Sequence, residues 1–495
     1  MKKVIVIGSG FAGLSAASFM AKAGWDVTVL EKHAMPGGRA RQFSTPEGYV
    51  FDMGPSWYWM PDVFERYFEC FGKKLSDYYQ LTRLDPSYRV YYPDGPLDIP
   101  ADYEALRRLF EELEPGSAAR LDAFMREAAY KYDVGINKLV HKPGQSFTEF
   151  IDMDLIKGVF RLDVFTDMKK HIRRFVNHPK LVQLLEFPVL FLGALPGNIP
   201  ALYSLMNYAD IKLGTWYPMG GMYKIVEGMY KLALDLGVTF KFNHEASSIN
   251  LEKRMARTVS AHHTGHGQTQ FEADVVIGGA DYHFIEEKLL PEAARSYSPA
   301  YWDKRVMAPS CLLYYVGLNK KLPGITHHSL FFDVDFDRHG KEIYDNPVWP
   351  TEPLFYVGAP SVTDPSVAPA GHENLFFLIP IAAGLPGDTE ELRQQYFDKI
   401  VTRYEAHIGT SIRDAIIYKR SYSVSDFVSD YHAFKGNAYG LANTLMQTAI
   451  LKPSLQSQKV NNLYFTGQLT VPGPGVPPSL ISGEVVSKEI LKAYK

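Results

Sequence analysis

The chain opens with an alternation of short apolar runs and glycines that predicts a strand, a helix and a second strand. Residues 4–7 are an uninterrupted apolar run that ends in Gly-Ser-Gly, as a buried parallel strand does before a tight turn. Small and apolar residues then recur at helical spacing over 11–23, and Gly24 follows as a helix stop. A second apolar run at 27–30 completes the unit. This order is typical of a doubly wound α/β fold.

Later patterns predict a helical region and a second sheet. Residues 101–185 are rich in helix formers and charge, and 389–407 place apolar side chains on one helix face, with Asp388 as the expected N-cap. Strand-like runs occur at 239–250, 274–277, 310–318, 353–358, 374–381 and 462–466. No internal repeat, low-complexity tract or linker separates these segments. We therefore expect the second domain to be woven into the first.

A length of 495 residues favours two or three connected domains. We predict the α/β class, with a Rossmann-like cofactor domain interleaved with a mixed-sheet substrate domain and a helical region. The cofactor domain is expected from residues 1–100, 236–290 and 456–495. The helical, membrane-facing region is expected from 101–235, and the substrate domain from 291–455.

The first turn carries a dinucleotide motif. The chain reads GSGFAG at 8–13, which is GxGxxG between a predicted strand and a predicted helix. Gly8 permits the tight turn, Gly10 lets the backbone approach a pyrophosphate, and Gly13 lets helix and strand pack closely. The helix start, with Phe11 and Ala12, then offers free N–H groups to the phosphates.

An acidic residue closes the second predicted strand at the distance that this motif requires. Glu31 stands 21 residues after Gly10 and is followed by Lys32. A carboxylate there accepts hydrogen bonds from the adenosine ribose and repels an extra 2′-phosphate, which disfavours NADP. The residues alone predict a dinucleotide site without separating FAD from NAD.

Two N-terminal stretches and one C-terminal stretch extend this site. The chain reads PGGRA at 36–40 and DMGPS at 52–56, and it ends in NLYFTGQ at 462–468 and VPGPGVPPS at 471–479. Paired glycines allow close backbone approach, and Arg39 offers a forked donor to phosphate. A helix that begins at the last stretch would point its N–H groups into the same site, and the resemblance described below implies that they face a flavin. The residues expected here are Gly38, Arg39, Ala40, Gly54, Pro55, Ser56, Gly467 and Val476.

With these motifs the chain resembles the bacterial-type phytoene desaturases, carotenoid desaturases of the FAD-dependent, amine oxidase-like superfamily. The resemblance covers nearly the whole length and includes TWYPMGGM at 215–222 and PSVTDPSVAP at 360–369. One turn departs from the family pattern: a His-Pro-Gly-Ala-Gly type turn reads Val-Pro-Gly-Pro-Gly at 471–475. Any polar role of that histidine is absent here.

The resemblance implies FAD as hydride acceptor, a polyene such as phytoene as substrate, lycopene-type products, and reoxidation by oxygen or a membrane quinone. It also puts Glu149 where an acidic catalytic residue has been proposed, although a surface glutamate is the alternative. Two other functions stay open. One is a 3,4-desaturase of a hydroxylated or monocyclic carotenoid end group, and the other is a non-catalytic isoprenoid-lipid-binding protein on the same fold. An amine oxidase is a weaker option.

The net charge and the cysteine content indicate which classes of partner to expect and in which cellular compartment the protein is located. A net charge of −3 gives no basic field for nucleic acid, and no metal-ligand spacing stands out. Two distant cysteines favour a reducing cytoplasm. Residues 181–195 are apolar and follow a basic cluster at 169–174, so they predict either a core helix or an interfacial element. The expected location is cytoplasmic, peripheral to the inner face of the cell membrane.

Overall fold

The first strand and helix form where the apolar pattern places them. In the computed structural model, which describes residues 1–146, 149, 162–190, 193–263, 265 and 267–495, β1 (Lys3–Ile7) is buried along its last four residues. The helix α1 (Phe11–Lys22) follows the glycine turn, and β2 (Asp26–Leu30) pairs with β1 in parallel. The predicted strand–helix–strand unit is confirmed.

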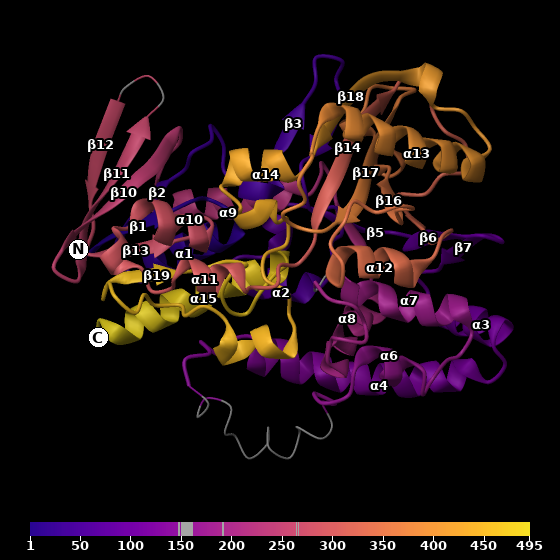
Figure 1. Ribbon diagram of the computed structural model, residues 1–495, viewed down its shortest axis with the longest axis horizontal. Helices are drawn as coiled ribbons and strands as arrows, with labels where there is room; N and C mark the ends of the chain where they lie inside the picture. The colour runs from indigo at the N-terminus through magenta and orange to yellow at the C-terminus, as the bar shows by residue number, and fades with distance from the viewer. Residues whose placement is uncertain (147–148, 150–161, 191–192, 264, 266) are drawn as a thin grey trace.

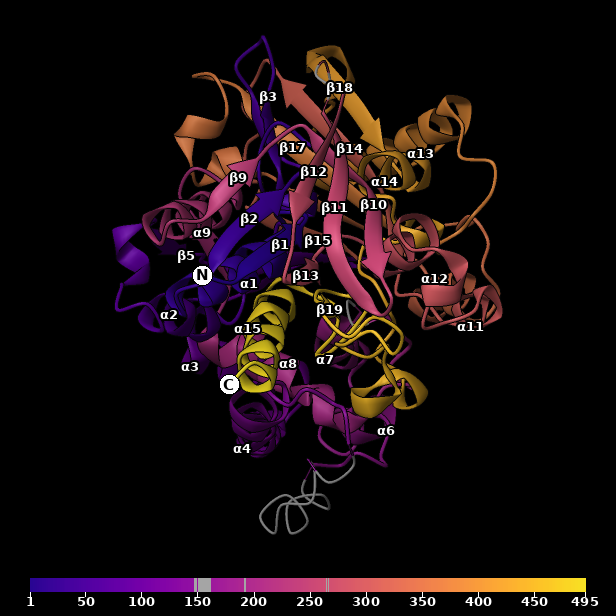
Figure 2. The same ribbon diagram turned by 90° about the vertical axis from the view of Figure 1, so that its left-hand side faces the viewer.

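This unit is part of a five-stranded parallel sheet built from distant parts of the chain. The strand order is β19-β13-β1-β2-β9, with β9 (Thr239–Lys241), β13 (Val275–Gly278) and β19 (Leu463–Phe465) joining the first two strands. The helices α9 (Tyr223–Asp235) and α15 (Val476–Ala493) both pack against α1 beside it. A three-stranded antiparallel sheet lies at the other side (Figure 2), made by β10 (His244–Glu252), β11 (Met255–His263) and β12 (Gly267–Glu272).

A second large sheet has seven strands and is mostly antiparallel. Its order is β18-β14-β17-β16-β15-β6-β7, and only the pairing of β15 with β6 is parallel among these described strands. The strands are β6 (Tyr88–Tyr92), β7 (Gly95–Ile99), β14 (Ser310–Leu318), β15 (His328–Phe331), β16 (Phe355–Gly358), β17 (Glu373–Ile381) and β18 (Ile416–Tyr422). Because β6 and β7 pair here, the boundary expected at residue 100 does not separate the two sheets.

Figure 1 shows the helical region at one end of the seven-stranded sheet, away from both termini. It contains α3 (Tyr103–Leu113), α4 (Ser117–Val134), α6 (Met168–Ile172), α7 (Pro179–Leu190) and α8 (Leu205–Tyr208). Eight of the twelve residues of α7 are buried, including Leu181, Leu185 and Phe187. Of the two interpretations of residues 181–195, the burial of α7 fits the core helix, and contact of this segment with a membrane stays a prediction. Among the described residues, no helix combines the length and apolar character that a bilayer crossing requires.

The remaining elements connect these layers. The long helix α13 (Glu390–Ile408) covers the outer face of the seven-stranded sheet, and its N-cap is Thr389, which accepts from the Leu392 N–H. The expected cap, Asp388, instead pairs with the buried Arg393. The others are β3 (Gln42–Ser44), β4 (Val50–Asp52), α2 (Pro61–Glu69), β5 (Leu81–Arg83), β8 (Trp216–Pro218), α10 (Tyr282–Phe284), α11 (Pro299–Asp303), α12 (Phe336–Tyr344) and α14 (Val424–Tyr431).

The architecture confirms the predicted α/β class with interleaved domains. Both large sheets are continuous with one hydrophobic core that contains residues of β1, β16, α7 and α15. A site that lies between the sheets therefore has walls from both.

Candidate cofactor and substrate site

One large cavity runs from the carboxyl ends of the five-stranded sheet to the inner face of the seven-stranded sheet. Its volume is about 390 Å³. All but one of the expected cofactor residues line it: Gly8, Gly10, Phe11, Ala12, Glu31, Lys32, Gly38, Arg39, Ala40, Gly54, Pro55, Ser56, Gly467 and Val476. Gly13 is the exception. Segments from both ends of the chain thus meet around the same space.

The glycine turn shapes the wall next to α1. Gly8 has φ +95°, a conformation that side chains rarely adopt, and it permits the turn out of β1. A Cβ on Gly13 would lie 2.0 Å from the Gly8 carbonyl oxygen, so Gly13 works behind the cavity, where helix and strand touch. Gly38 packs on Gly10 in the same way, with 3.3 Å from its Cβ position to the Gly10 Cα. The helix start is therefore bare backbone, as a bound pyrophosphate requires.

The carboxylate at the end of β2 is held in place by its neighbours. Glu31 Oε2 accepts the Ser9 N–H at 2.9 Å and the Ser9 hydroxyl at 2.6 Å, and Oε1 accepts the His33 N–H at 2.9 Å. Since a carboxylate has about four acceptor positions, it keeps capacity for a further donor from the cavity. The arrangement fits recognition of a ribose hydroxyl.

Arg39 is the cation of this cavity that fits a phosphate. Its Nη2 donates to the Asn437 carbonyl at 3.2 Å, whereas its buried Nε has no hydrogen-bond partner among the described residues. Burial lowers the pKa of the Arg39 guanidinium, and nearby Asp281 raises it. A buried guanidinium with an unused N–H donor lowers the stability of the fold unless an anion accepts that hydrogen bond. The donor set therefore fits the diphosphate of a dinucleotide.

Lys32, which the sequence predicted, and several residues that it did not single out close the adenosine end. The His432 Nε2 lies 2.6 Å from Glu245 Oε1, and Lys32 Nζ donates to the Ser429 carbonyl at 2.7 Å. The imidazole of His432 stacks on Phe284 with centroids 3.9 Å apart. These contacts attach the end of α14 to β2 and β10 across the cavity rim. They join segments about 190 to 400 residues apart, which no local pattern reveals.

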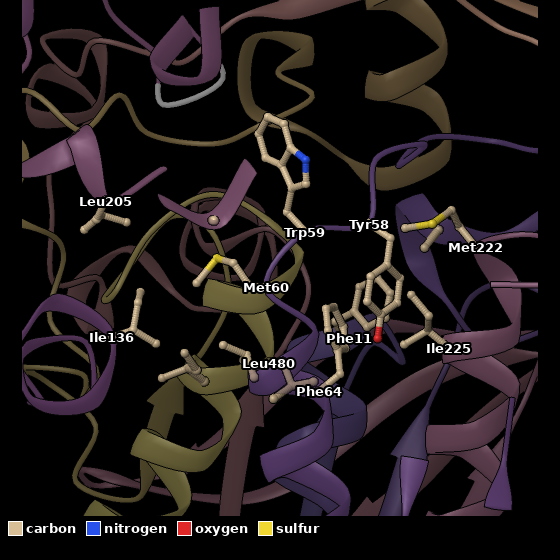
Figure 3. Packing of buried hydrophobic residues seen from close by; sticks show 14 of the residues in the cluster. Phe11, Tyr58, Trp59, Met60, Phe64, Ile136, Leu205, Met222, Ile225 and Leu480 are labelled. Carbon is tan, nitrogen blue, oxygen red and sulfur yellow. The ribbon is translucent and has the colours of Figure 1, made fainter. Parts of the chain in front are cut away.

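The inner end of the cavity is apolar. Phe11, Trp59, Met60, Phe64 and Met222 line it. Figure 3 shows Phe11 and Phe64 close together, with the Trp59 ring pointing away from them. Here α15 begins, as expected, beside the cavity. Its first residues include Pro477 and Pro478, which carry no N–H, so the expected row of helix N–H groups is reduced to Val476 within the first three residues.

The structure does not support Glu149 as a catalytic group. Its carboxylate accepts the backbone N–H groups of Gly144, Gln145 and Ser146 at 2.8–3.0 Å. Glu149 is also absent from the lining of the cavity as far as the described residues define it. Most of its acceptor capacity is used by a local turn, so the described contacts are those of a loop cap, and the catalytic role stays a prediction.

Asp52, at the start of the DMGPS stretch, anchors the neighbouring loop. Its carboxylate accepts the N–H groups of Met222 at 2.7 Å and Tyr223 at 3.1 Å, and the Gln42 amide at 3.0 Å. Burial, the largest effect, raises the pKa of Asp52 to about 6, although these three donors lower it. The loop that leads to Gly54 is therefore tied to the start of α9.

This raised pKa predicts a pH dependence of stability. The folded state binds a proton below about pH 6, while the unfolded chain binds it only near pH 3.8. Unfolding free energy attributable to Asp52 should therefore increase by about 1 kcal/mol as the pH falls from 7.5 to 5. Urea titrations of the wild type and of Asp52→Asn at both pH values measure this difference. Equal pH dependence in the two proteins would contradict it.

The wall opposite the glycine turn comes from the seven-stranded sheet. It contains Cys311 and Leu313 of β14, Tyr356 of β16 and Leu378 of β17, with Trp57 beside them. This wall is apolar and aromatic apart from the Tyr356 hydroxyl. The two ends of the cavity thus differ in chemistry: one suits phosphates and ribose, and the other suits an apolar ligand.

Known proteins share both the sequence and this architecture. Residues 11–491 match the family model of flavin-containing amine oxidoreductases. The carotenoid 3,4-desaturase of Haloarcula japonica is 42% identical over 493 residues, covering 99% of this chain and 98% of the relative. The zeta-carotene-forming phytoene desaturase of Myxococcus xanthus is 30% identical over 496 residues, covering 99% and 94%. An oxidoreductase structure from Methanosarcina mazei superposes with a TM-score of 0.61 at 17% identity, covering 98% of this chain and all of that one.

Proposed function

Because the chain belongs to the family of flavin-containing amine oxidoreductases and is an FAD-dependent carotenoid desaturase, we propose that it forms the double bond at the 3,4 position of a carotenoid. The observation that carries this finer assignment is the 42% identity to a carotenoid 3,4-desaturase over nearly both whole chains. Relatives that act on phytoene are about 30% identical. The substrate is thus a polyene whose end still has a saturated C3–C4 bond.

The residues around the cavity divide into those for the cofactor and those for the substrate. Arg39 and the N-terminus of α1 would hold the FAD diphosphate, and Glu31 the ribose. The stretch from Gly54 to Ser56 would carry the flavin towards the apolar end. FAD, when bound, supplies the acceptor for the hydride that leaves the substrate. The groups that would bind the phosphates and the apolar wall that would bind the substrate therefore lie at opposite ends of the cavity.

The apolar wall has two tasks in this proposal. Trp57, Trp59 and Leu378 would make apolar contacts along the hydrocarbon chain of the substrate. They also exclude water from the reacting carbons, which protects a cationic intermediate of the polyene from hydration. Alignment of one C–H bond is the main requirement, since positioning alone supplies a large share of such rate enhancements.

A second candidate keeps the chemistry and changes the substrate. Desaturation of phytoene is supported by the full-length match to a zeta-carotene-forming phytoene desaturase. A non-catalytic lipid carrier has less support, because the bare glycine turn, Glu31 and Arg39 are all in place around the cavity.

Product analysis separates these functions. We expect purified protein with FAD to add one double bond at the 3,4 position of a carotenoid that is saturated there, and to leave phytoene unchanged. Liquid chromatography with absorption spectra measures the longer conjugation. Conversion of phytoene to lycopene would favour the second candidate, and no conversion of either polyene by FAD-loaded protein would contradict both. Anaerobic assays with and without a quinone test whether oxygen or a membrane quinone reoxidises the enzyme.

We further propose that the protein contacts a membrane through an apolar edge formed by Phe165, Met446 and Leu451. Their exposed fractions are 86%, 76% and 42%. Residues 201–203 connect the segment of Phe165 with the segment of Met446 and Leu451. The Ala201 N–H donates to the Thr166 carbonyl, and the Tyr203 side chain interacts with Thr448. The basic residues of α6 lie next to Phe165 in the chain. Exposed apolar side chains beside cations suit an anionic bilayer surface.

This contact predicts a loss of membrane binding on mutation. The double variant Phe165→Ser/Met446→Ser should bind anionic liposomes about 10-fold more weakly, because two apolar side chains no longer enter the interface. Flotation of protein with liposomes measures the bound fraction. Val428→Ser, which changes an exposed valine on α14, is the control and should bind as wild type does. Equal flotation of all three proteins would contradict the proposed edge.

A further inference from the structure

Desaturation requires a group that takes up a proton, and the seven-stranded sheet offers one at the cavity wall. When hydride leaves one carbon of a polyene, the neighbouring carbon must lose a proton before the double bond is complete. Tyr356 brings a hydroxyl to this otherwise apolar wall. Burial raises the pKa of Tyr356, so its hydroxyl is protonated in the resting protein and takes up a further proton only if its own is passed on.

Two neighbouring strands place Tyr356 against an imidazole. In the antiparallel pair β15–β16, His328 stands opposite Gly358, and Tyr356 opposite Leu330, so the two side chains are diagonal neighbours on one face. The Tyr356 hydroxyl oxygen lies 2.7 Å from His328 Nδ1. A Cβ on Gly358 would lie 2.6 Å from that oxygen. The absence of a side chain at 358 therefore creates the space that the hydroxyl occupies.

The hydroxyl lies between the cofactor path and the imidazole. Tyr356 lines the cavity together with Ser56, the residue that ends the DMGPS stretch, and the Ser56 side chain lowers the pKa of Tyr356 against the larger effect of burial. With Ser56 as donor to the phenol oxygen, the Tyr356 O–H is free to donate to His328 Nδ1. In this tautomer the Tyr356 proton is directed to the imidazole, and one acceptor position of the phenol oxygen remains for the substrate in our proposal.

The environment of His328 keeps it neutral and yet able to hold a proton. Burial, the largest effect, and the neighbouring His327 lower the pKa of His328 far below its usual range. The Trp57 ring stacks on the imidazole at 4.2 Å and 10°, and an aromatic face stabilises a cation that forms on it. His328 Nε2 is buried and has no hydrogen-bond partner in the described part of the chain. Such unsatisfied groups are uncommon outside functional sites.

We propose that Tyr356 and His328 together accept the proton released in desaturation. Tyr356 is the catalytic residue: its oxygen takes the proton from the carbon next to the one that lost hydride, while its own proton moves to His328 Nδ1. The electron pair of the broken C–H bond becomes the new π bond. One O–H bond forms, another breaks, and an N–H bond forms on His328. After the product leaves, His328 returns the proton to water.

A weakly basic imidazole is sufficient for this step. The proton leaves a carbon next to a cationic centre, which is a far stronger acid than a protonated imidazole. Transfer is therefore downhill even with a lowered pKa, and regeneration of the neutral imidazole is fast for the same reason. The inference rests on the proposed function, because only a desaturation supplies this proton.

Tyr356→Phe tests the catalytic role. We expect the rate of polyene desaturation to fall about 100-fold, because a general base typically contributes that much. Bound FAD and the thermal unfolding midpoint should stay as in the wild type. A deuterium isotope effect at the carbon that loses the proton should increase, since proton loss becomes rate-limiting. Tyr314→Phe is the matched control: Tyr314 is in the same sheet but packs on α13 and donates to the Arg393 carbonyl.

His328→Asn separates proton holding from positioning. The asparagine Oδ1 stands near the place of Nδ1 and accepts the Tyr356 hydrogen bond, but it does not take the proton. We expect this variant to be as slow as Tyr356→Phe; a wild-type rate would overturn the relay. In flavin-free protein, the ¹⁵N NMR signal of His328 Nδ1 should be that of an unprotonated, hydrogen-bonded nitrogen. A protonated Nδ1 would overturn the proposal independently of any turnover measurement.

The outcomes also distinguish this inference from the function on which it rests. Wild-type protein that holds FAD but desaturates no polyene overturns the proposed function and the relay with it. Wild-type turnover combined with unchanged turnover of Tyr356→Phe overturns the relay alone.

Discussion

Gly13→Val is expected to give a protein that is nearly free of FAD and markedly less stable. A Cβ at this position would lie 2.0 Å from the Gly8 carbonyl oxygen, well inside any real contact distance. The other nearby atoms are the Gly8 carbonyl carbon and a Val6 methyl group, so no flexible side chain can move aside. α1 must therefore shift away from β1, and its N-terminal N–H groups leave the phosphate position.

Two measurements check this expectation. Unfolding free energy from urea titration should fall by about 3 kcal/mol, the upper end for overpacking. Flavin released by heat denaturation should be less than about one tenth of the wild-type amount, since a loss of 1.4 kcal/mol in binding is already tenfold. Gly197→Ala is the control, because a Cβ there meets nothing within 4 Å. Normal flavin content in Gly13→Val would disprove the role of this contact.

Arg39→Ala is expected to weaken FAD binding about 100-fold while leaving the fold intact. Hydrogen bonds to a charged group contribute about 1.5–3 kcal/mol, and Arg39 would supply them to the diphosphate. The flavin-free protein should lose little stability, because burial penalises the guanidinium and its Nε has no partner among the described residues. The prediction is therefore a separation: weaker cofactor binding without a weaker fold.

Fluorescence titration of flavin-free protein with FAD gives the dissociation constant of each variant. Arg89→Ala serves as the control, since Arg89 pairs with Asp98 at the surface and lies outside the cavity lining. Such surface pairs contribute less than about 1 kcal/mol. An unchanged dissociation constant in Arg39→Ala would mean that the phosphates lie elsewhere.

Much of the cofactor side was predictable because its signals are local. The GSGFAG turn, Glu31 and the PGGRA stretch each combine a backbone requirement with a residue type that meets it, and all reach one cavity. The resemblance added the C-terminal stretch, which the structure brings to the same place. The helix at 389–407 was also predictable from its periodicity, although its cap is one residue later, at Thr389.

The substrate side was not predictable for a physical reason. Tyr356 and His328 lie in strands whose residues are all buried. The hydrophobic pattern of the sequence therefore does not distinguish these two residues from core residues. Their contact depends on the pairing register of β15 and β16 and on the missing side chain of Gly358. The contacts of Glu149 were not predictable from the sequence either. Its expected role rested only on its position in the family resemblance, whereas its carboxylate contacts the backbone of a turn.

The five-stranded sheet has a consequence for how the protein is made. Its strands come from residues 3–30, 239–278 and 463–465, and α15, which packs on α1, is the last helix of the chain. During synthesis, domains generally fold as they emerge, with N-terminal parts first. Here the N-terminal unit emerges with its glycine turn complete but without the neighbours that close the cavity. The cavity is therefore complete only after β19 and α15 have been synthesised, and until then the apolar surfaces that they cover stay exposed.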